Sequence, residues 1–195
     1  DGAVILDGKD ITYEKEFVRS RYIGHLFQDP MKGTAPNMSI EENLALAYLR
    51  ASGGRGRIFS RVSKKEKDFF REKLALLDMG LEDRMKNPVG LLSGGQRQAL
   101  TLLMATLVTP KILLLDEHTA ALDPKTSAEV MALTQQIVTA NHLTTMMITH
   151  KMSDALTYGD RLVMVQDGQI KLDVCGAEKQ ALRTDDLVTM FAAEV

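Results

Sequence analysis

Two neighbouring carboxylates follow a continuous apolar run in the middle of the chain. Asp116 and Glu117 come directly after Ile112–Leu115. A run without polar alternation is typical of a parallel strand covered on both faces, and parallel strands present their carboxyl ends to ligands. A carboxylate there can hold Mg²⁺, and the adjacent one can orient or deprotonate an attacking water. Asp116 is therefore a candidate metal ligand and Glu117 a candidate general base. A strand followed by two solvated acids in a loop is the structural alternative.

A glycine pair upstream has the composition of an anion site. Residues 92–96 spell LSGGQ and precede a helical pattern. The glycines leave backbone N–H groups open to an anion, and the helix that follows directs its positive dipole end to the same place. The sequence predicts a phosphate site formed by Ser93, Gly94, Gly95 and Gln96. A serine-capped helix start is the structural alternative.

The spacing of apolar residues along the chain predicts the strands and helices that position these residues. Strands and helices alternate over 94–166, which indicates an α/β domain with a parallel sheet, and the helix-rich stretch 30–95 looks inserted. Ser39 and Glu42 form a capping box at a helix start. We expect strands at 4–6, 22–27, 112–115 and 144–149, a hairpin of 161–166 with 169–174, and helices from 39, over 64–79, from 94, over 124–141, over 152–158 and over 184–191.

Composition is that of an ordinary soluble domain. The 195 residues are 45% hydrophobic and 26% charged, with a net charge of −2, so nothing global suggests nucleic-acid binding. The single cysteine, Cys175, fits a reducing cytoplasm, and no apolar run approaches the ~18–20 residues that span a bilayer. Residues 50–73 carry nine basic residues against three acidic ones. We interpret them as a solvated loop and helix face rather than a surface for anionic lipid or a permease.

LSGGQ followed at short range by an apolar strand with two terminal carboxylates resembles the signature and Walker B motifs of ABC-type ATPases. Over nearly its whole length the chain is similar to the ATP-binding subunit of ABC transporters. The resemblance implies an α/β P-loop NTPase (RecA-like) fold. Residues 1–29 and 96–195 would form part of the ATPase core, and residues 30–95 an inserted helical subdomain with the signature at its end.

The resemblance also implies roles for single residues and two cofactors, ATP and Mg²⁺. Gln28 matches the Q-loop glutamine, which contacts Mg²⁺ and the attacking water. His150 matches the switch histidine at the γ-phosphate, and Asp123 matches the D-loop aspartate, which reaches across a dimer interface. ATP would lie between two subunits, where Ser93 and Gly95 of one would grip the γ-phosphate of the nucleotide held by the other.

The implied partners are a second ATPase subunit, a transmembrane permease and an extracytoplasmic solute-binding protein, with no nucleic acid. The chain would work at the cytoplasmic face of the bacterial membrane and energise transport, which we expect to be import. Residues 33–44 and 116–123 resemble a subgroup of importers that are uncharacterised or take up tryptophan or tyrosine.

One family motif is absent. No G-x-x-x-x-G-K-[ST] occurs. At the only Gly-Lys pair, Gly8-Lys9, Ala3 stands where the motif needs its first glycine, and Asp10 stands where it needs Ser or Thr. We expect truncation before or through Walker A, with the phosphate-binding loop upstream of Asp1, and a fragment that is inactive alone. The alternatives are a degenerate, non-catalytic cassette and a soluble ABC-type ATPase of DNA repair or translation. The short 28–93 gap, the single cysteine and the single signature favour a transporter.

Overall fold

The computed structural model describes residues 2–53 and 62–192. The chain forms two compact units, 1–147 and 148–195. The glycine-rich part of the predicted basic loop, residues 54–61, lies outside the described residues.

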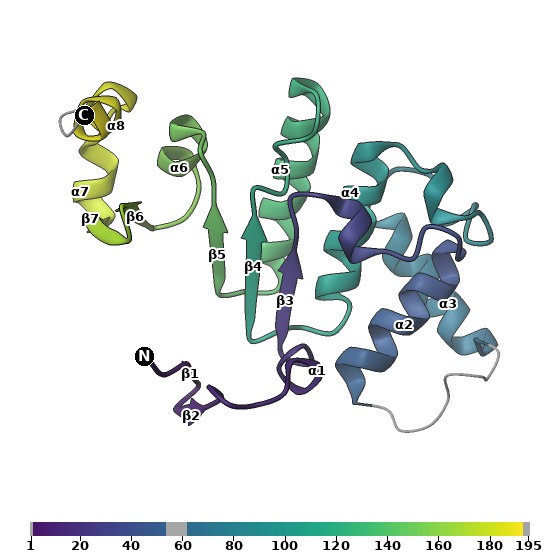
Figure 1. Ribbon diagram of the computed structural model, residues 1–195. Coiled ribbons are helices and arrows are strands. Elements are labelled where there is room, and N and C mark those ends of the chain that lie inside the picture. The colour runs from purple at the N-terminus through teal and green to yellow at the C-terminus, as the bar shows by residue number, and fades with distance from the viewer. Residues whose placement is uncertain (1, 54–61, 193–195) are drawn as a thin grey trace. The chain divides into compact units, whose positions relative to one another are not determined.

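A three-stranded sheet organises the first unit. Its strands are β3 (Ile23–Leu26), β4 (Ile112–Asp116) and β5 (Thr145–Ile148), in the order β3-β4-β5. All three point the same way in Figure 1, and β3 pairs with β4 in a parallel register that sets Leu26 opposite Leu115. The predicted α/β fold with a parallel sheet is confirmed.

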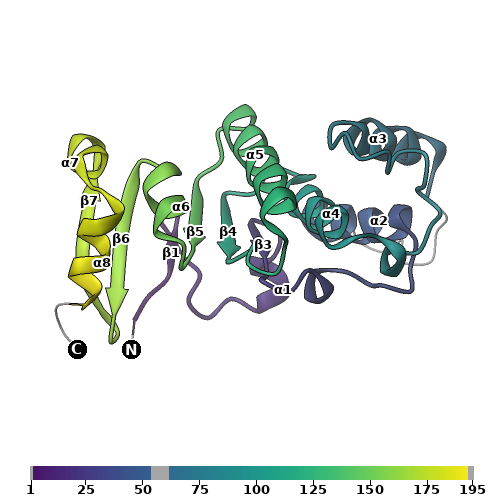
Figure 2. The same cartoon turned by 90° about the horizontal axis from the view of Figure 1, so that it is seen from above.

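Two helices cover one face of this sheet. These are α4 (Gly94–Thr106) and α5 (Pro124–Ala140), which lie on the same side in Figure 2. Helix α4 approaches β3 so closely that a Cβ added at Gly24 would lie 2.9 Å from the backbone oxygen of Ala105. Leu113 points to the same side and is fully buried. The glycine thus lets helix and strand pack directly against each other.

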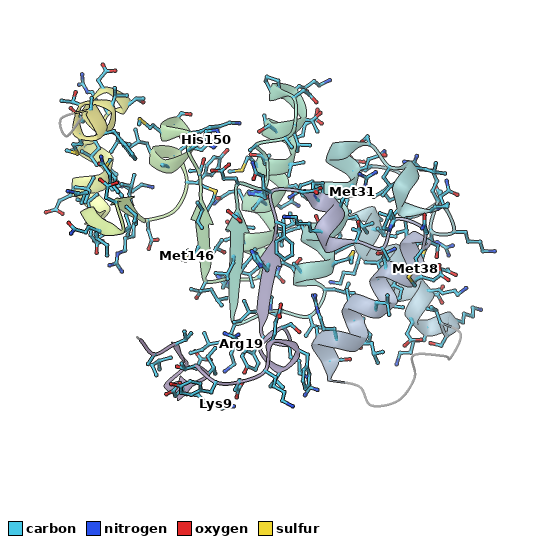
Figure 3. The ribbon with its side chains drawn as sticks, viewed as in Figure 1. Lys9, Arg19, Met31, Met38, Met146 and His150 are labelled. Atoms are coloured by element: carbon cyan, nitrogen blue, oxygen red, sulfur yellow. The ribbon has the colours of Figure 1, made fainter. Side chains whose placement is uncertain are left out.

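The prediction that this strand is covered on both faces is wrong for the described residues. Ile112 and Leu114 are only half-buried, and Met146 on β5 (labelled in Figure 3) is 58% exposed. The physical reason is that α4 and α5 lie on the same side of the sheet, so these two helices bury only alternate side chains of β4.

A group of helices follows β3 in the first unit. Helix α2 (Ile40–Ser52) and helix α3 (Lys64–Ala75) each start with a capping box. At α2 the predicted box is confirmed: Ser39 Oγ accepts from the Glu42 N–H at 3.3 Å, and Glu42 accepts from the Ser39 N–H at 2.7 Å. The first turn is also held by a distant segment, because the Ile40 and Glu41 N–H groups donate to the Asn87 and Met85 carbonyls at 3.1 and 2.9 Å.

Helix α3 ends earlier than predicted, at Ala75 instead of Met79. The Leu77 N–H returns to the Leu74 carbonyl, which tightens the last turn, and Asp78 and Gly80 then adopt positive φ angles of 53° and 63°. Left-handed residues cannot continue a right-handed helix.

The second unit is a hairpin with helices. The predicted hairpin is confirmed, and Asp167 and Gly168 at its turn have φ angles of 51° and 73°, as a type I′ turn requires. Its elements are α6 (Met152–Thr157), β6 (Arg161–Gln166), β7 (Gln169–Cys175), α7 (Gly176–Ala181) and α8 (Thr184–Ala192). The remaining short elements of the chain are β1 (Ile5–Leu6), β2 (Lys9–Asp10), α1 (Glu16–Arg19), and the 3₁₀ turns η1 (Pro30–Gly33) and η2 (Val89–Leu91). Among the described helices, none has the length and hydropathy needed to cross a membrane.

Candidate functional site

The parallel pairing of β3 and β4 brings three predicted residues to one edge of the sheet. Gln28 follows β3 by two residues, Asp116 ends β4, and Glu117 comes next. Gln28 Nε2 donates to Glu117 Oε2 at 3.4 Å, although the two residues lie 89 positions apart in the chain. The predicted metal ligand, base and Q-loop amide are therefore neighbours.

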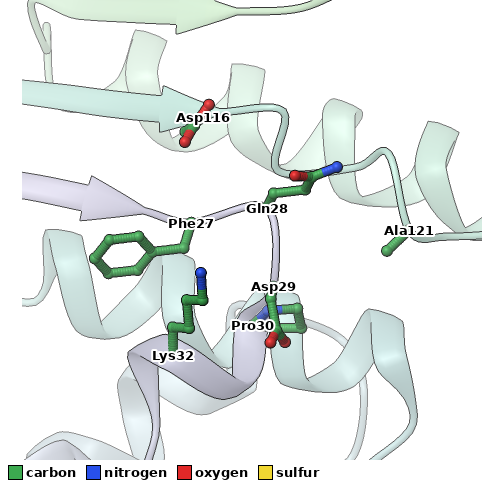
Figure 4. Close-up of a pocket in the computed structure, with 7 residues that line it drawn as sticks. All are labelled: Phe27, Gln28, Asp29, Pro30, Lys32, Asp116 and Ala121. Carbon is green, nitrogen blue, oxygen red and sulfur yellow. The ribbon is translucent and has the colours of Figure 1, made fainter.

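A cleft of about 300 Å³ opens at this edge (Figure 4). Its lining comprises Phe27, Gln28, Asp29, Pro30, Lys32, Asp116 and Ala121. Sequence reasoning missed Lys32, which comes from η1 and adds a cation to the cleft. The signal was weak, because a lysine in a Pro-Met-Lys-Gly segment is more often a solvated surface residue.

The donor set of the cleft suits a hard cation. Asp116 and Gln28 supply carboxylate and amide oxygens. Among residues 2–53 and 62–192, no group of three His, Cys, Asp or Glu residues converges. Mg²⁺ does not need such a group, since it uses one or two carboxylates together with substrate phosphates and water. The residues present therefore fit Mg²⁺ bound with a nucleotide.

Glu117 has an unusual backbone conformation. Its φ angle is +44°, in the left-handed region, and its carbonyl accepts the Ala120 N–H at 2.9 Å. A non-glycine residue pays about 1–2 kcal/mol for this conformation, and such strain persists only where the surroundings enforce it. The turn after β4 thus fixes the direction of the candidate base.

The predicted phosphate site lies at the start of α4. Ser93 is the N-cap: its Oγ accepts the Gln96 N–H at 3.3 Å, and Gln96 Oε1 accepts the Ser93 N–H at 3.2 Å. Ser93 and Gly94 are exposed, whereas Gly95 is buried. The serine-capped helix start is therefore present, and anion binding at the same place stays a prediction.

The two signature glycines also serve packing, which the sequence did not reveal. A Cβ at Gly95 would lie 2.2 Å from Thr126 Cγ2, and one at Gly94 would lie 3.2 Å from Leu122 Cδ2. Glycine at 95 therefore allows α4 to meet the first turn of α5. This contact places the signature against the segment that contains Asp123.

Asp123 caps α5. Its Oδ1 accepts the Thr126 N–H at 3.1 Å, and the hydrogen bonds from Thr126 lower the pKa of the Asp123 carboxyl. The side chain is therefore ionised at neutral pH. Its role across a dimer interface stays a prediction.

Arg97 is a further residue that the motif did not single out. Its Nη2 donates to the carbonyl oxygens of Gly90 at 3.1 Å and Leu92 at 3.0 Å, and its Nη1 contacts the sulfur of Met31. The guanidinium thus fastens the segment before Ser93 to α4 and to η1.

His150 lies two residues after the end of β5 in the sequence, belongs to the second unit and is exposed (Figure 3). Its predicted role as a switch histidine stays a prediction.

Fold and site define a class of protein: a parallel α/β domain with an acidic strand edge and a glycine-started helix. Residues 1–120 match the ABC transporter family (ABC_tran). The chain is 41% identical over 192 residues to a tyrosine transport ATP-binding protein of Clostridioides difficile. The alignment covers 97% of this chain and 74% of that relative. The chain therefore belongs to the family of ABC transporter ATP-binding subunits, which are ATPases.

A second relative and a solved structure are also ATP-binding proteins. A methionine import ATP-binding protein, MetN, of Streptococcus pneumoniae is 37% identical over 197 residues, and the chain spans about half of its length, 52%. Among solved structures, the ATP-binding cassette MJ0796 in a dimeric post-hydrolysis state bound to ADP and Pi superposes with a TM-score of 0.72 at 24% identity. The superposition covers 90% of this chain and 73% of the MJ0796 chain, and it supports the α/β fold.

Proposed function

We propose that the chain is the ATP-hydrolysing subunit of an importer, with ATP held between two copies of the subunit. The observation that carries this proposal is the Gln28–Glu117 hydrogen bond at the end of paired parallel strands, because it joins a candidate base to an amide that can orient water.

Each copy would contribute different residues to the reaction. Glu117 would take the proton from the attacking water, and Gln28 would orient that water. Ser93 and Gly95 would bind the γ-phosphate of the partner's nucleotide through the start of α4, where N–H groups and the helix dipole favour an anion. His150 would contact the γ-phosphate, and Asp123 would reach across the interface.

Asp116, with the amide oxygen of Gln28, would hold Mg²⁺. The ion would neutralise the charge that develops on the phosphates during hydrolysis. Residues 1–195 contain no G-x-x-x-x-G-K-[ST], so we propose that they do not hydrolyse ATP alone and that the phosphate-binding loop belongs to the full-length subunit.

The proposed setting is the cytoplasmic face of the membrane, where the subunit would bind a permease that receives solute from an extracytoplasmic binding protein. The relative named for tyrosine transport covers 97% of this chain and supports an aromatic amino acid as the solute. The solute would contact the binding protein and permease rather than this subunit.

Replacement of the base tests the proposal. In the full-length subunit, Glu117→Gln should lower ATP turnover at least a hundredfold, because an amide cannot accept the proton. Glu129→Gln is the matched control, since Glu129 is an exposed residue on α5. Unchanged turnover in Glu117→Gln would contradict the general-base role.

A further inference from the structure

His118 lies directly after the candidate base and is buried. It is 3% exposed, and its Nε2 lies 3.2 Å from Thr134 Oγ1 on α5. The Thr134 hydroxyl donates its own proton to the Val130 carbonyl at 2.8 Å. It can therefore only accept from His118, so the imidazole carries a proton on Nε2.

This hydrogen bond ties the strand end to the middle of a helix. Thr134 is 4% exposed and lies one full helical turn from Val130, within α5. Helix α5 is packed on the sheet through Leu133, which belongs to the main hydrophobic core. The anchor point is therefore rigid, unlike a loop.

Glu117, which has a strained backbone conformation, directly precedes this buried and hydrogen-bonded histidine. Glu117 holds a φ of +44°, and its carbonyl accepts the N–H of Ala120, three residues on, which closes the turn locally. A strained backbone conformation persists only where the surroundings also enforce it. The buried His118 side chain, hydrogen-bonded to α5 at the next position, is such a contact.

We propose that His118 is a positioning residue, which through Thr134 holds Glu117 in the orientation that its role as general base requires. The inference rests on the proposed function. It assigns no proton transfer to His118. The inference also extends to Thr119, which is 6% exposed and starts the segment that leads to Asp123.

The test removes the acceptor without touching the site. Thr134→Val keeps the shape of the side chain and removes the hydroxyl, whereas Thr134→Ser restores it. Thr139→Val is the matched control, because Thr139 is an exposed threonine on the same helix. Each variant is made in the full-length subunit, and kcat and KM for ATP are measured together with hydrogen exchange of the Ala120 amide.

We expect Thr134→Val to lower kcat roughly tenfold to a hundredfold with KM for ATP changed less than threefold, because a small misplacement of a reacting group costs that much. Exchange at Ala120 should accelerate at least tenfold, and Thr134→Ser and Thr139→Val should match the wild type. A wild-type kcat in Thr134→Val, or an equal loss in Thr139→Val, would overturn the inference.

Failure of the proposed function and failure of the His118 inference give different results. If Glu117→Gln retains full turnover, the proposed function fails, and the anchor is then judged on Ala120 exchange alone: unchanged exchange in Thr134→Val refutes it. If Thr134→Val does not fold, Thr134→Cys replaces the hydroxyl by a weak acceptor of similar size and gives the same comparison.

Discussion

At the residue scale, two buried polar side chains hold loops of this chain. His118 fastens the turn after β4, and Asn43 fastens the segment between η1 and α2. Each of these residues is at most 3% exposed. Because a buried polar group without a partner is costly, each one restricts its neighbours to a single arrangement.

The pH dependence of stability should report on His118. Burial lowers its pKa from 6.5 to about 4, so the unfolded chain binds this proton more readily than the folded one. The contribution to stability is complete above pH 6.5 and is lost as the pH falls towards 4. From pH 7 to pH 5 we expect the free energy of unfolding to fall by about 2 kcal/mol through this group.

Urea unfolding at pH 7, 6 and 5 measures this effect. In His118→Gln, which cannot take up the proton, the same interval should show a correspondingly shallower fall. Parallel pH profiles in the two proteins would exclude the neutral, buried state of His118.

Asn43 allows a second prediction. Its Oδ1 accepts the Ala35 N–H at 2.8 Å, and its Nδ2 donates to the Ala35 and Ser39 carbonyls at 3.1 and 2.9 Å. Asn43→Ala should cost about 3 kcal/mol in the free energy of unfolding, since it leaves these groups without partners. The exposed Asn37 is the control, and Asn37→Ala should change that free energy by less than about 0.5 kcal/mol. Equal losses in both variants would contradict the account.

At the element scale, the start of α4 carries two demands at once. It offers exposed backbone at Ser93 and Gly94, and it packs against α5 at Gly95. Only the first demand is visible in the sequence, because packing partners distant in the chain leave no local pattern.

Gly95→Ala separates the two demands. Alanine normally stabilises a helix relative to glycine by about 0.5–1 kcal/mol. Here we expect a loss of about 2 kcal/mol instead, because the added Cβ would lie 2.2 Å from Thr126 Cγ2. Thr126→Ser removes that methyl group and keeps the hydroxyl, so the double variant should regain at least half of the loss in urea unfolding. No recovery would mean that the clash is not the cause.

A helix start or a turn could be predicted from the sequence where adjacent residues determine it. The capping box of Ser39 and the turn at Asp167-Gly168 were predicted correctly, since both are set by adjacent residues. The end of α3 was misplaced because the left-handed Asp78 has no strong sequence signal. The half-covered sheet was missed because a continuous apolar run does not tell which face a helix covers.

At the scale of the whole molecule, some residues of the candidate site could be predicted from the sequence and others could not. The family resemblance implied that Gln28, Asp116 and Glu117 act at one Mg²⁺ and one water, and the parallel register of β3 and β4 explains why these residues lie close together. Lys32 and Arg97 could not be found, because their contacts come from segments that only the fold brings together. The roles of His150 and Asp123 concern a nucleotide or a second copy and stay predictions.

The central claim is that the signature of one copy binds the nucleotide held by another. Sedimentation of full-length Glu117→Gln tests it, because this variant should trap ATP before hydrolysis. We predict a dimer with ATP, a monomer without it, and a monomer with ATP when Ser93→Arg is added at the exposed cap of α4. A monomer of Glu117→Gln at saturating ATP, or a dimer that persists in the double variant, would contradict the account.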